Sequence, residues 1–239
     1  MIEHRPFASL RRAEHGWLQA RHHFAFGADR DAMPTAWGRI RAWNDDEIAP
    51  GTGFDPHPHR DMEIVTFVRQ GAITHRDSLG NQGRTEAGDV QVMSAGSGIV
   101  HAEYNLEPVT TTLFQIWITP DRRGGTPAWG SRRVPREAGQ GFALLASGRP
   151  GDAATPLDGG ALPLNADAAV LAATLAPAER TTLGLRAGAA AYLVVARGSA
   201  TLNGQPLAER DAAAIRDEAQ LSLEAGPEGA ELVLVETAG

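Results

Sequence analysis

The 239-residue sequence contains no cysteine. Disulfides, thiolate metal sites and a cysteine nucleophile are therefore excluded, and any bound metal must be held by nitrogen and oxygen atoms. A membrane-spanning helix needs about 18 or more consecutive apolar residues, and the sequence has no such run. The polar start at residues 1–5 does not resemble a signal peptide. We therefore expect a soluble, cytoplasmic protein without membrane contact.

Positive charge is also scarce. The formal net charge is −7 and the isoelectric point is about 5.6. A face that binds nucleic acid needs an excess of Lys and Arg along the phosphate backbone. The composition therefore argues against direct nucleic-acid binding and leaves small molecules or another protein as the expected partners.

Long amphipathic helices are missing from the pattern. Short apolar segments of strand length alternate with turns, and the 27 glycines and 15 prolines are spread throughout. This pattern is typical of an all-β barrel or sandwich. The Ala-rich stretches 166–178 and 187–191 are the nearest candidates for helices, although Pro177 and Gly188 weaken both. Strands are expected at 63–68, 89–93, 112–118 and 192–195, and a hairpin turn is expected at 203–204.

A connector rich in glycine and proline, at about 119–150, separates two halves that share a faint pattern. In each half a glycine after a strand is followed, beyond a short hairpin, by an aspartate. The pairs are Gly71 with Asp89 and Gly198 with Asp211. We therefore predict a duplicated barrel.

The expected domains are an N-terminal metal-binding barrel over residues 1–133 and a C-terminal barrel without metal ligands over residues 134–239. Arg210 stands where the first half has Gly88, which leaves open whether that turn is kept.

Histidine is absent after position 101, so the second half cannot hold a histidine-based metal site. In the first half His57 and His59 are two residues apart, as are His101 and Glu103. Residues two apart on a β-strand point to the same face, so each pair can send two side chains into one space. Imidazole and carboxylate groups suit a divalent transition metal. Glu63 shares strand parity with His57 and His59, so the residues alone leave the carboxylate open. In the alternative, Glu63 orients a ligand histidine.

Other histidines and the aromatic residues have more ordinary expected roles. His22 and His23 are adjacent and face opposite ways on a strand, so neither is expected to be a ligand. His75 begins a polar segment and is expected to be a turn or rim residue that hydrogen-bonds Asp77 or the backbone. Four aromatic residues are expected mainly in the core: Trp43, Phe67, Phe114 and Trp117.

Longer motifs surround these residues. The segment 57–66 reads His-Pro-His-Arg-Asp-Met-Glu-Ile-Val-Thr, and the segment 93–103 runs from Met-Ser-Ala-Gly to His-Ala-Glu. Together with His-Arg-Asp-Ser-Leu-Gly-Asn at 75–81, they resemble the pirin family over about residues 10–120. The glycine and histidine spacing from 51 to 71 is also similar to the first cupin motif. Pirin-like proteins are bicupins, so the resemblance implies two tandem cupin β-barrels of the jelly-roll type, with one metal site in the N-terminal barrel.

The resemblance also implies a ligand set of His57, His59, His101 and Glu103, and it favours Glu103 over Glu63. Fe(II) is the expected metal, with Cu, Ni, Mn or Zn as alternatives. Several bacterial members are described as quercetin 2,3-dioxygenases. The expected activity is therefore oxidative ring cleavage of a flavonol by dioxygen, with Glu103 as general base. The alternative is a non-enzymatic, metal-dependent redox sensor or a regulator that binds a protein partner. A self-contained bicupin is expected to be a monomer.

Overall fold

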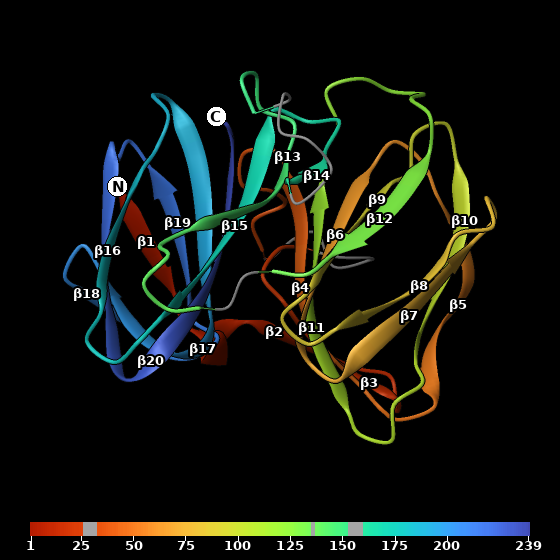
Figure 1. The fold of residues 1–239 in the computed structure, drawn as a ribbon, viewed down its shortest axis with the longest axis horizontal. Coiled ribbons are helices and arrows are strands. Elements are labelled where there is room, and N and C mark those ends of the chain that lie inside the picture. The colour runs from red at the N-terminus through yellow and green to blue at the C-terminus, as the bar shows by residue number, and fades with distance from the viewer. Residues whose placement is uncertain (26–32, 135–136, 153–159) are drawn as a thin grey trace.

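The computed structural model describes residues 1–25, 33–134, 137–152 and 160–239. Apart from one 3-10 helix at Phe7–Ser9, the regular elements in these ranges are β-strands. The strands form three sheets arranged as two cupin domains, so the all-β bicupin prediction is confirmed. Figure 1 shows β15 to β20 gathered with β1 in one lobe and β4 to β12 in the other. No helix in the described ranges is long and apolar enough to cross a membrane.

Two sheets form the first barrel. The four-stranded sheet has the order β5 (Thr52–His59), β10 (Ile99–Asn105), β7 (Ala72–Asp77) and β8 (Gln82–Glu86). The seven-stranded sheet has the order β12 (Ala128–Arg132), β9 (Val90–Ser94), β6 (Glu63–Gln70), β11 (Thr111–Ile118), β4 (Ile40–Ile48), β3 (Leu18–His22) and β2 (Arg11–Glu14).

A nine-stranded sheet forms the second barrel. Its main order is β1 (Ile2–Arg5), β19 (Ala212–Arg216), β17 (Ala189–Leu202), β20 (Gln220–Ala238), β15 (Ala168–Leu175), β13 (Ala143–Ser147) and β14 (Leu162–Pro163). Two further strands pair at its side, β16 (Arg180–Gly184) with β20 and β18 (Gln205–Leu207) with β17. The division at residues 1–133 and 134–239 stays a prediction, and the strand pairing crosses it, because β1 joins β19.

The four strands expected from the sequence are present: 63–68, 112–118 and 192–195 lie within β6, β11 and β17, and 89–93 overlaps β9 at 90–93. The Ala-rich stretches are not helices: 168–175 is β15, and 189–191 opens β17. Both faces of β15 are buried. Ala168, Val170 and Ala172 pack toward the first barrel, whereas Ala169 and Leu171 pack inside the second. Alternate residues of β15 are thus buried on opposite faces, and the side chains on both faces are small. This two-residue period is typical of a buried strand and not of a helix.

The seven-stranded sheet is also covered on both sides. Its outer face places Trp43, Phe67 and Phe114 against Val170 and Tyr192 of the second half, in one continuous core cluster. These three aromatic residues lie in the core as predicted. The inner face looks into the first barrel, where polar residues interrupt the apolar strands.

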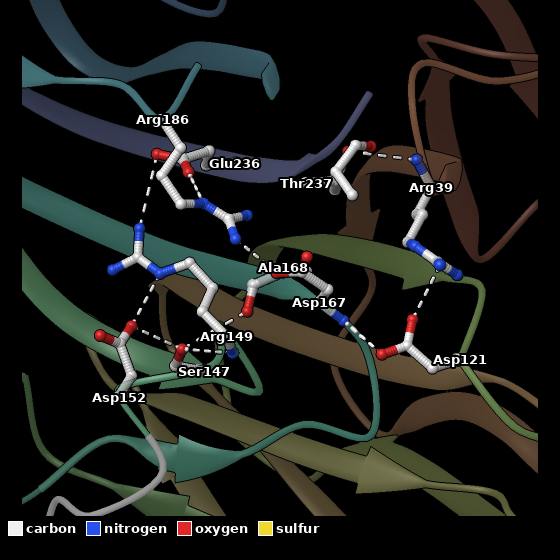
Figure 2. A network of polar contacts seen from close by, with 11 residues as sticks. Arg39, Asp121, Ser147, Arg149, Asp152, Asp167, Ala168, Arg186, Glu236 and Thr237 are labelled. Atoms are coloured by element: carbon white, nitrogen blue, oxygen red, sulfur yellow. Dashed lines mark hydrogen bonds and ion pairs between the residues drawn. The ribbon is translucent and has the colours of Figure 1, made fainter. Parts of the chain in front are cut away.

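A polar network borders this apolar interface (Figure 2). Arg39 contacts the Asp121 carboxylate at 2.9 Å, and the backbone N–H of Asp167 donates to the same carboxylate at 3.0 Å. The backbone N–H of Arg39 donates to the Thr237 hydroxyl at 3.2 Å. The Arg186 guanidinium lies 2.5 Å from the Asp167 carboxylate and belongs to the same network. The halves are thus joined by an apolar centre with a polar margin.

Matching hydrogen bonds support the internal repeat. The N–H of Gly88 donates to the carbonyl of Val68, and the N–H of Arg210 donates to that of Val195. Gly88 has φ 80°, and Arg210 keeps the same left-handed conformation at φ 68°. The turn is therefore retained although an arginine occupies the glycine position.

Ion pairs across the halves hold Arg210 in this conformation. Its guanidinium contacts Asp45 at 2.6 Å and Glu47 at 2.9 Å. Asp45 is fully buried and also contacts Arg69. A buried carboxylate needs such partners, because an uncompensated charge in the interior is costly.

Two substitutions at Arg210 separate the backbone strain from the ion pairs. Arg210→Ala removes the contacts to Asp45 and Glu47 and keeps the strained backbone, so the free energy of unfolding should fall by about 2 kcal/mol. Arg210→Gly removes the same contacts but relieves the left-handed conformation, so it should be about 1 kcal/mol more stable than Arg210→Ala. Urea unfolding of the wild-type protein and the two variants measures both differences. Equal stabilities of the two variants would show that the left-handed backbone at position 210 is not strained.

Candidate metal centre

The four-stranded sheet brings three predicted ligands together. His57 on β5 lies directly opposite His101 on the neighbouring antiparallel strand β10. The His57 ring centroid is 4.5 Å from that of His101 and 4.8 Å from that of His59. One ring nitrogen of each of the three histidines lies within 4.8 Å of those of the other two. The two separate histidine motifs therefore meet at one place in the barrel.

Glu103 adjoins this cluster through His101. The register of β10 against β5 shifts between His101 and Glu103. A carboxylate oxygen of Glu103 lies within 4.8 Å of ring nitrogens of His75 and His101, and all three side chains are buried. His101 is thus common to two groups of metal-binding side chains.

Glu63 lies elsewhere. Its carboxylate accepts hydrogen bonds from the Ser94 hydroxyl at 2.6 Å and the Asn165 N–H at 3.1 Å, at the boundary with the second half. Strand parity does not carry from His59 to Glu63, because the chain leaves one sheet and enters the other between them, with Asp61 at φ 51°. Its geometry therefore supports neither a ligand role nor a hydrogen bond to a ligand histidine.

His59 and His101 have the charge state that a metal ligand needs. Burial, assisted by neighbouring histidines, lowers the pKa of His101 to about 3 and that of His59 to about 4. The Nδ1 atom of His57 lies 2.7 Å from the carbonyl oxygen of Asp55, which can only accept, so Nδ1 carries the proton and Nε2 presents a lone pair. Within the described part of the chain, the buried Nε2 of His101 has no hydrogen-bond partner. Neutral imidazoles with free lone pairs fit a divalent cation.

A hydrogen-bonded chain sets the orientation of His101. The Asp77 carboxylate accepts from Nε2–H of His75 at 3.0 Å, which leaves Nδ1 of His75 as an acceptor. Nδ1 of His101 lies 3.4 Å from that atom and can donate to it, so Nε2 of His101 keeps its lone pair. His75 also stacks on Trp129, with centroids 4.8 Å apart. The expected bond to Asp77 is present, but the expected rim position was wrong, because His75 is fully buried in β7.

The opposite sheet holds the Glu103 carboxylate. Gln91 and Gln115 donate their side-chain N–H groups to its two oxygens, at 2.6 Å and 2.8 Å. The amide oxygens of these two glutamines accept from the Thr85 hydroxyl and from the Trp117 indole N–H, which fixes both amides. Burial raises the pKa of Glu103 to about 7, against the effect of the amide donors. Neither glutamine was predicted, although a polar residue within an apolar strand was the available signal.

A cavity of about 340 Å³ opens beside His57 and His59. Its walls are mainly aromatic and polar: His15, Trp17, Leu18, Ala20, His22, Asn44, Asp46, Phe54, Gln115 and Trp117. Trp117, expected in the core, is partly buried against a core cluster and also lines the cavity, where its ring meets that of His59 edge-on at 5.0 Å.

His22 and His23 face opposite ways, as predicted. His22 lines the cavity, whereas His23 contacts the Tyr192 hydroxyl at 3.0 Å in the core between the halves. A planar aromatic ligand could enter the cavity and reach the histidine cluster.

Two barrels with a buried His/Glu cluster in one of them define a metal-binding bicupin. Comparison with known proteins identifies the family within this class of bicupins. Residues 4–118 match the family model described as Pirin, and residues 153–237 match the Quercetinase C-terminal cupin domain. The chain belongs to the pirin family.

Its relatives include proteins of similar length. A pirin-like protein of Caulobacter vibrioides is 56% identical over 100% of both chains. A Pseudomonas aeruginosa protein provisionally named a quercetin 2,3-dioxygenase is 57% identical, also over 100% of both. The quercetin 2,3-dioxygenase of Escherichia coli is 37% identical over 89% of each chain. The structure of the Escherichia coli pirin YhhW in complex with nickel(II) superposes with a TM-score of 0.89, at 36% identity, over 100% of this chain and 99% of that one.

The lowered pKa values predict the protonation state of the metal-free protein. His59 and His101 should remain neutral at pH 6, because their pKa values lie near 4 and 3, whereas an ordinary histidine near 6.5 is mostly charged. Protonation should follow only as the pH falls toward those values. NMR of ¹⁵N-labelled histidine measures the charge, and it should report Nδ1–H for His101. The urea-unfolded protein is the control, and charged His59 or His101 at pH 6 in the folded protein would contradict the prediction.

Proposed function

We propose that this chain is a metal-dependent dioxygenase that cleaves flavonols, with the metal held by His57, His59, His101 and Glu103. The observation that carries the proposal is the convergence of three imidazoles beside an aromatic-walled cavity, with the pKa values of His59 and His101 lowered by burial. The name of the Escherichia coli relative supports the reaction class. We propose Fe(II) as the metal, and the nickel complex of YhhW makes Ni(II) the first alternative to compare.

Each part of the site has a chemical role in this proposal. When bound, the metal supplies a Lewis acid that favours the deprotonated form of a substrate hydroxyl. The rings of Trp17, Phe54 and Trp117 border the space in which a planar substrate would lie. We propose Glu103 as the group that accepts the hydroxyl proton. Gln91, Gln115 and Thr66 hydrogen-bond to this carboxylate, which leaves one of its four lone pairs unused by them. The expectations of a monomer and of a cytoplasmic location stay predictions.

Oxygen uptake with quercetin tests the activity. The protein is stripped and refilled separately with iron, nickel, manganese or copper, and its metal content is measured. We expect uptake with at least one metal and a loss of at least about 100-fold in His101→Ala, because one of three imidazoles is removed. No uptake from any protein with full metal occupancy would reject the enzyme and favour a metal-dependent sensor or partner-binding regulator. A pull-down that compares metal-loaded and metal-free protein would then test that alternative.

The hydrogen-bonded chain from Asp77 through His75 to His101 predicts that a substitution at Asp77, which is not a proposed metal ligand, lowers metal affinity. Asp77→Asn removes the charge that fixes the His75 tautomer, so Nδ1 of His75 no longer has to accept from His101. We expect nickel affinity to fall by about 10–100-fold, as measured by competition with a chelator. Asp55→Asn is the matched control, because only the backbone carbonyl of Asp55 contacts His57. Equal affinities in the two variants would show that the chain does not position the ligand.

A further inference from the structure

The inner face of the seven-stranded sheet carries a row of polar side chains. Cross-strand pairing aligns one residue from each of five neighbouring strands: His22, Asn44, Gln115, Thr66 and Gln91. The two glutamines in this row donate to Glu103. The row continues past them to Asn44, away from Glu103, and Asp46 lies two residues further along β4 on the same face.

Two oxygen atoms at this end have no protein partner. Within the described residues, Oδ1 of Asn44 and Oδ1 of Asp46 make no hydrogen bond, although these side chains are only 5% and 2% exposed. A buried polar atom without a partner is costly, so natural proteins keep few of them without a reason. Both residues line the 340 Å³ cavity beside His57 and His59. Both side chains therefore border a space that a ligand can enter, with their unpartnered oxygens buried just behind its wall.

The chemistry of this wall narrows the ligand. Burial, with the nearby carboxylates of Asp45 and Glu103 adding to it, raises the pKa of Asp46 to about 8. A neutral carboxyl both donates and accepts, and the Asn44 oxygen accepts, which suits a hydroxyl group better than an anion. The aromatic rings of Trp17, Phe54 and Trp117 on the same cavity suit a planar ring.

We propose that Asn44 and Asp46 recognise the ring hydroxyl groups of an aromatic substrate whose reacting hydroxyl lies at the histidine cluster. The inference rests on the proposed function, because it takes the histidine end of the cavity as the reacting end. It narrows the substrate class to planar polyphenols that carry hydroxyl groups beyond the one that reacts. Removing such a hydroxyl would leave the two oxygens unpaired in the complex, which is how a buried polar site rejects an analogue.

A series of flavonols tests the recognition. 3-Hydroxyflavone carries only the reacting hydroxyl, galangin adds two on the fused ring, and kaempferol and quercetin add one and then two on the pendant ring. Binding to the nickel-loaded protein is measured by quenching of tryptophan fluorescence. At least one step along the series should gain about tenfold in affinity, the value of a well-made hydrogen bond. The same step should vanish in Asp46→Leu and in Asn44→Leu, while 3-hydroxyflavone keeps its affinity.

The controls separate recognition from folding. Glu47→Leu changes the neighbouring carboxylate on the opposite face of β4, and it should keep the discrimination of the wild-type protein. Asp46→Leu should not lower the melting temperature, because it removes a buried Oδ1 that has no hydrogen-bond partner within the described residues. If it fails to fold, Asn44→Leu carries the test.

Oxygen uptake on the same samples keeps the two proposals apart. Discrimination that depends on Asn44 or Asp46, without oxygen uptake, would support the recognition site and reject the dioxygenase. Uptake with equal binding of all four flavonols, or with discrimination unchanged in both leucine variants, would overturn the recognition site and leave the dioxygenase standing. Absence of binding by every flavonol would also overturn the recognition site.

Discussion

Burial of the seven-stranded sheet on both faces is the constraint on which the rest of this structure depends. Its outer face joins the second half through Trp43, Phe114 and their apolar neighbours, so the sheet is fixed in place. Its inner face can then carry Gln91 and Gln115, which meet a carboxylate from the opposite sheet. Polar groups between two sheets are tolerated only when their hydrogen bonds are made. The two glutamines supply hydrogen bonds to the Glu103 carboxylate. These hydrogen bonds depend on the fixed position of the sheet that carries the glutamines.

The same burial determines the chemistry of the histidines. Removing imidazoles from water disfavours their charged form, and each neighbouring histidine adds to that effect. Neutral rings can take two tautomers, so the protein must also decide which nitrogen faces the centre. The carbonyl of Asp55 decides it for His57, and the chain from Asp77 through His75 decides it for His101. Two different partners thus leave Nε2 free in both rings.

The sequence allowed the main strands, the two-barrel plan and the convergence of His57, His59 and His101 to be predicted, because parity along a strand and long family motifs are local signals. The failures concern non-local information. Parity wrongly linked Glu63 to the histidines, since the chain changes sheets at 60–62. His75 could not be placed before its pairing with Glu103 was known. The Ala-rich strands show the same limit, because small residues on both faces reflect packing against two neighbours rather than helix propensity.

The second half has no histidine, yet it shapes the site through β4. Asp45 and Asp46 are adjacent and therefore face opposite sides of the sheet. Asp45 points to the interface, where Arg69 and Arg210 compensate its charge, and Arg210 keeps a left-handed backbone at the turn from which it reaches Asp45. Asp46 lies on the opposite face and lines the cavity; burial raises its pKa, and its Oδ1 lacks a partner within the described residues. Two neighbouring carboxyl groups thus receive opposite environments, a pattern by which proteins divide structural and chemical roles. An arginine from the second barrel can stabilise the strand because it contacts the face of β4 that points away from the cavity.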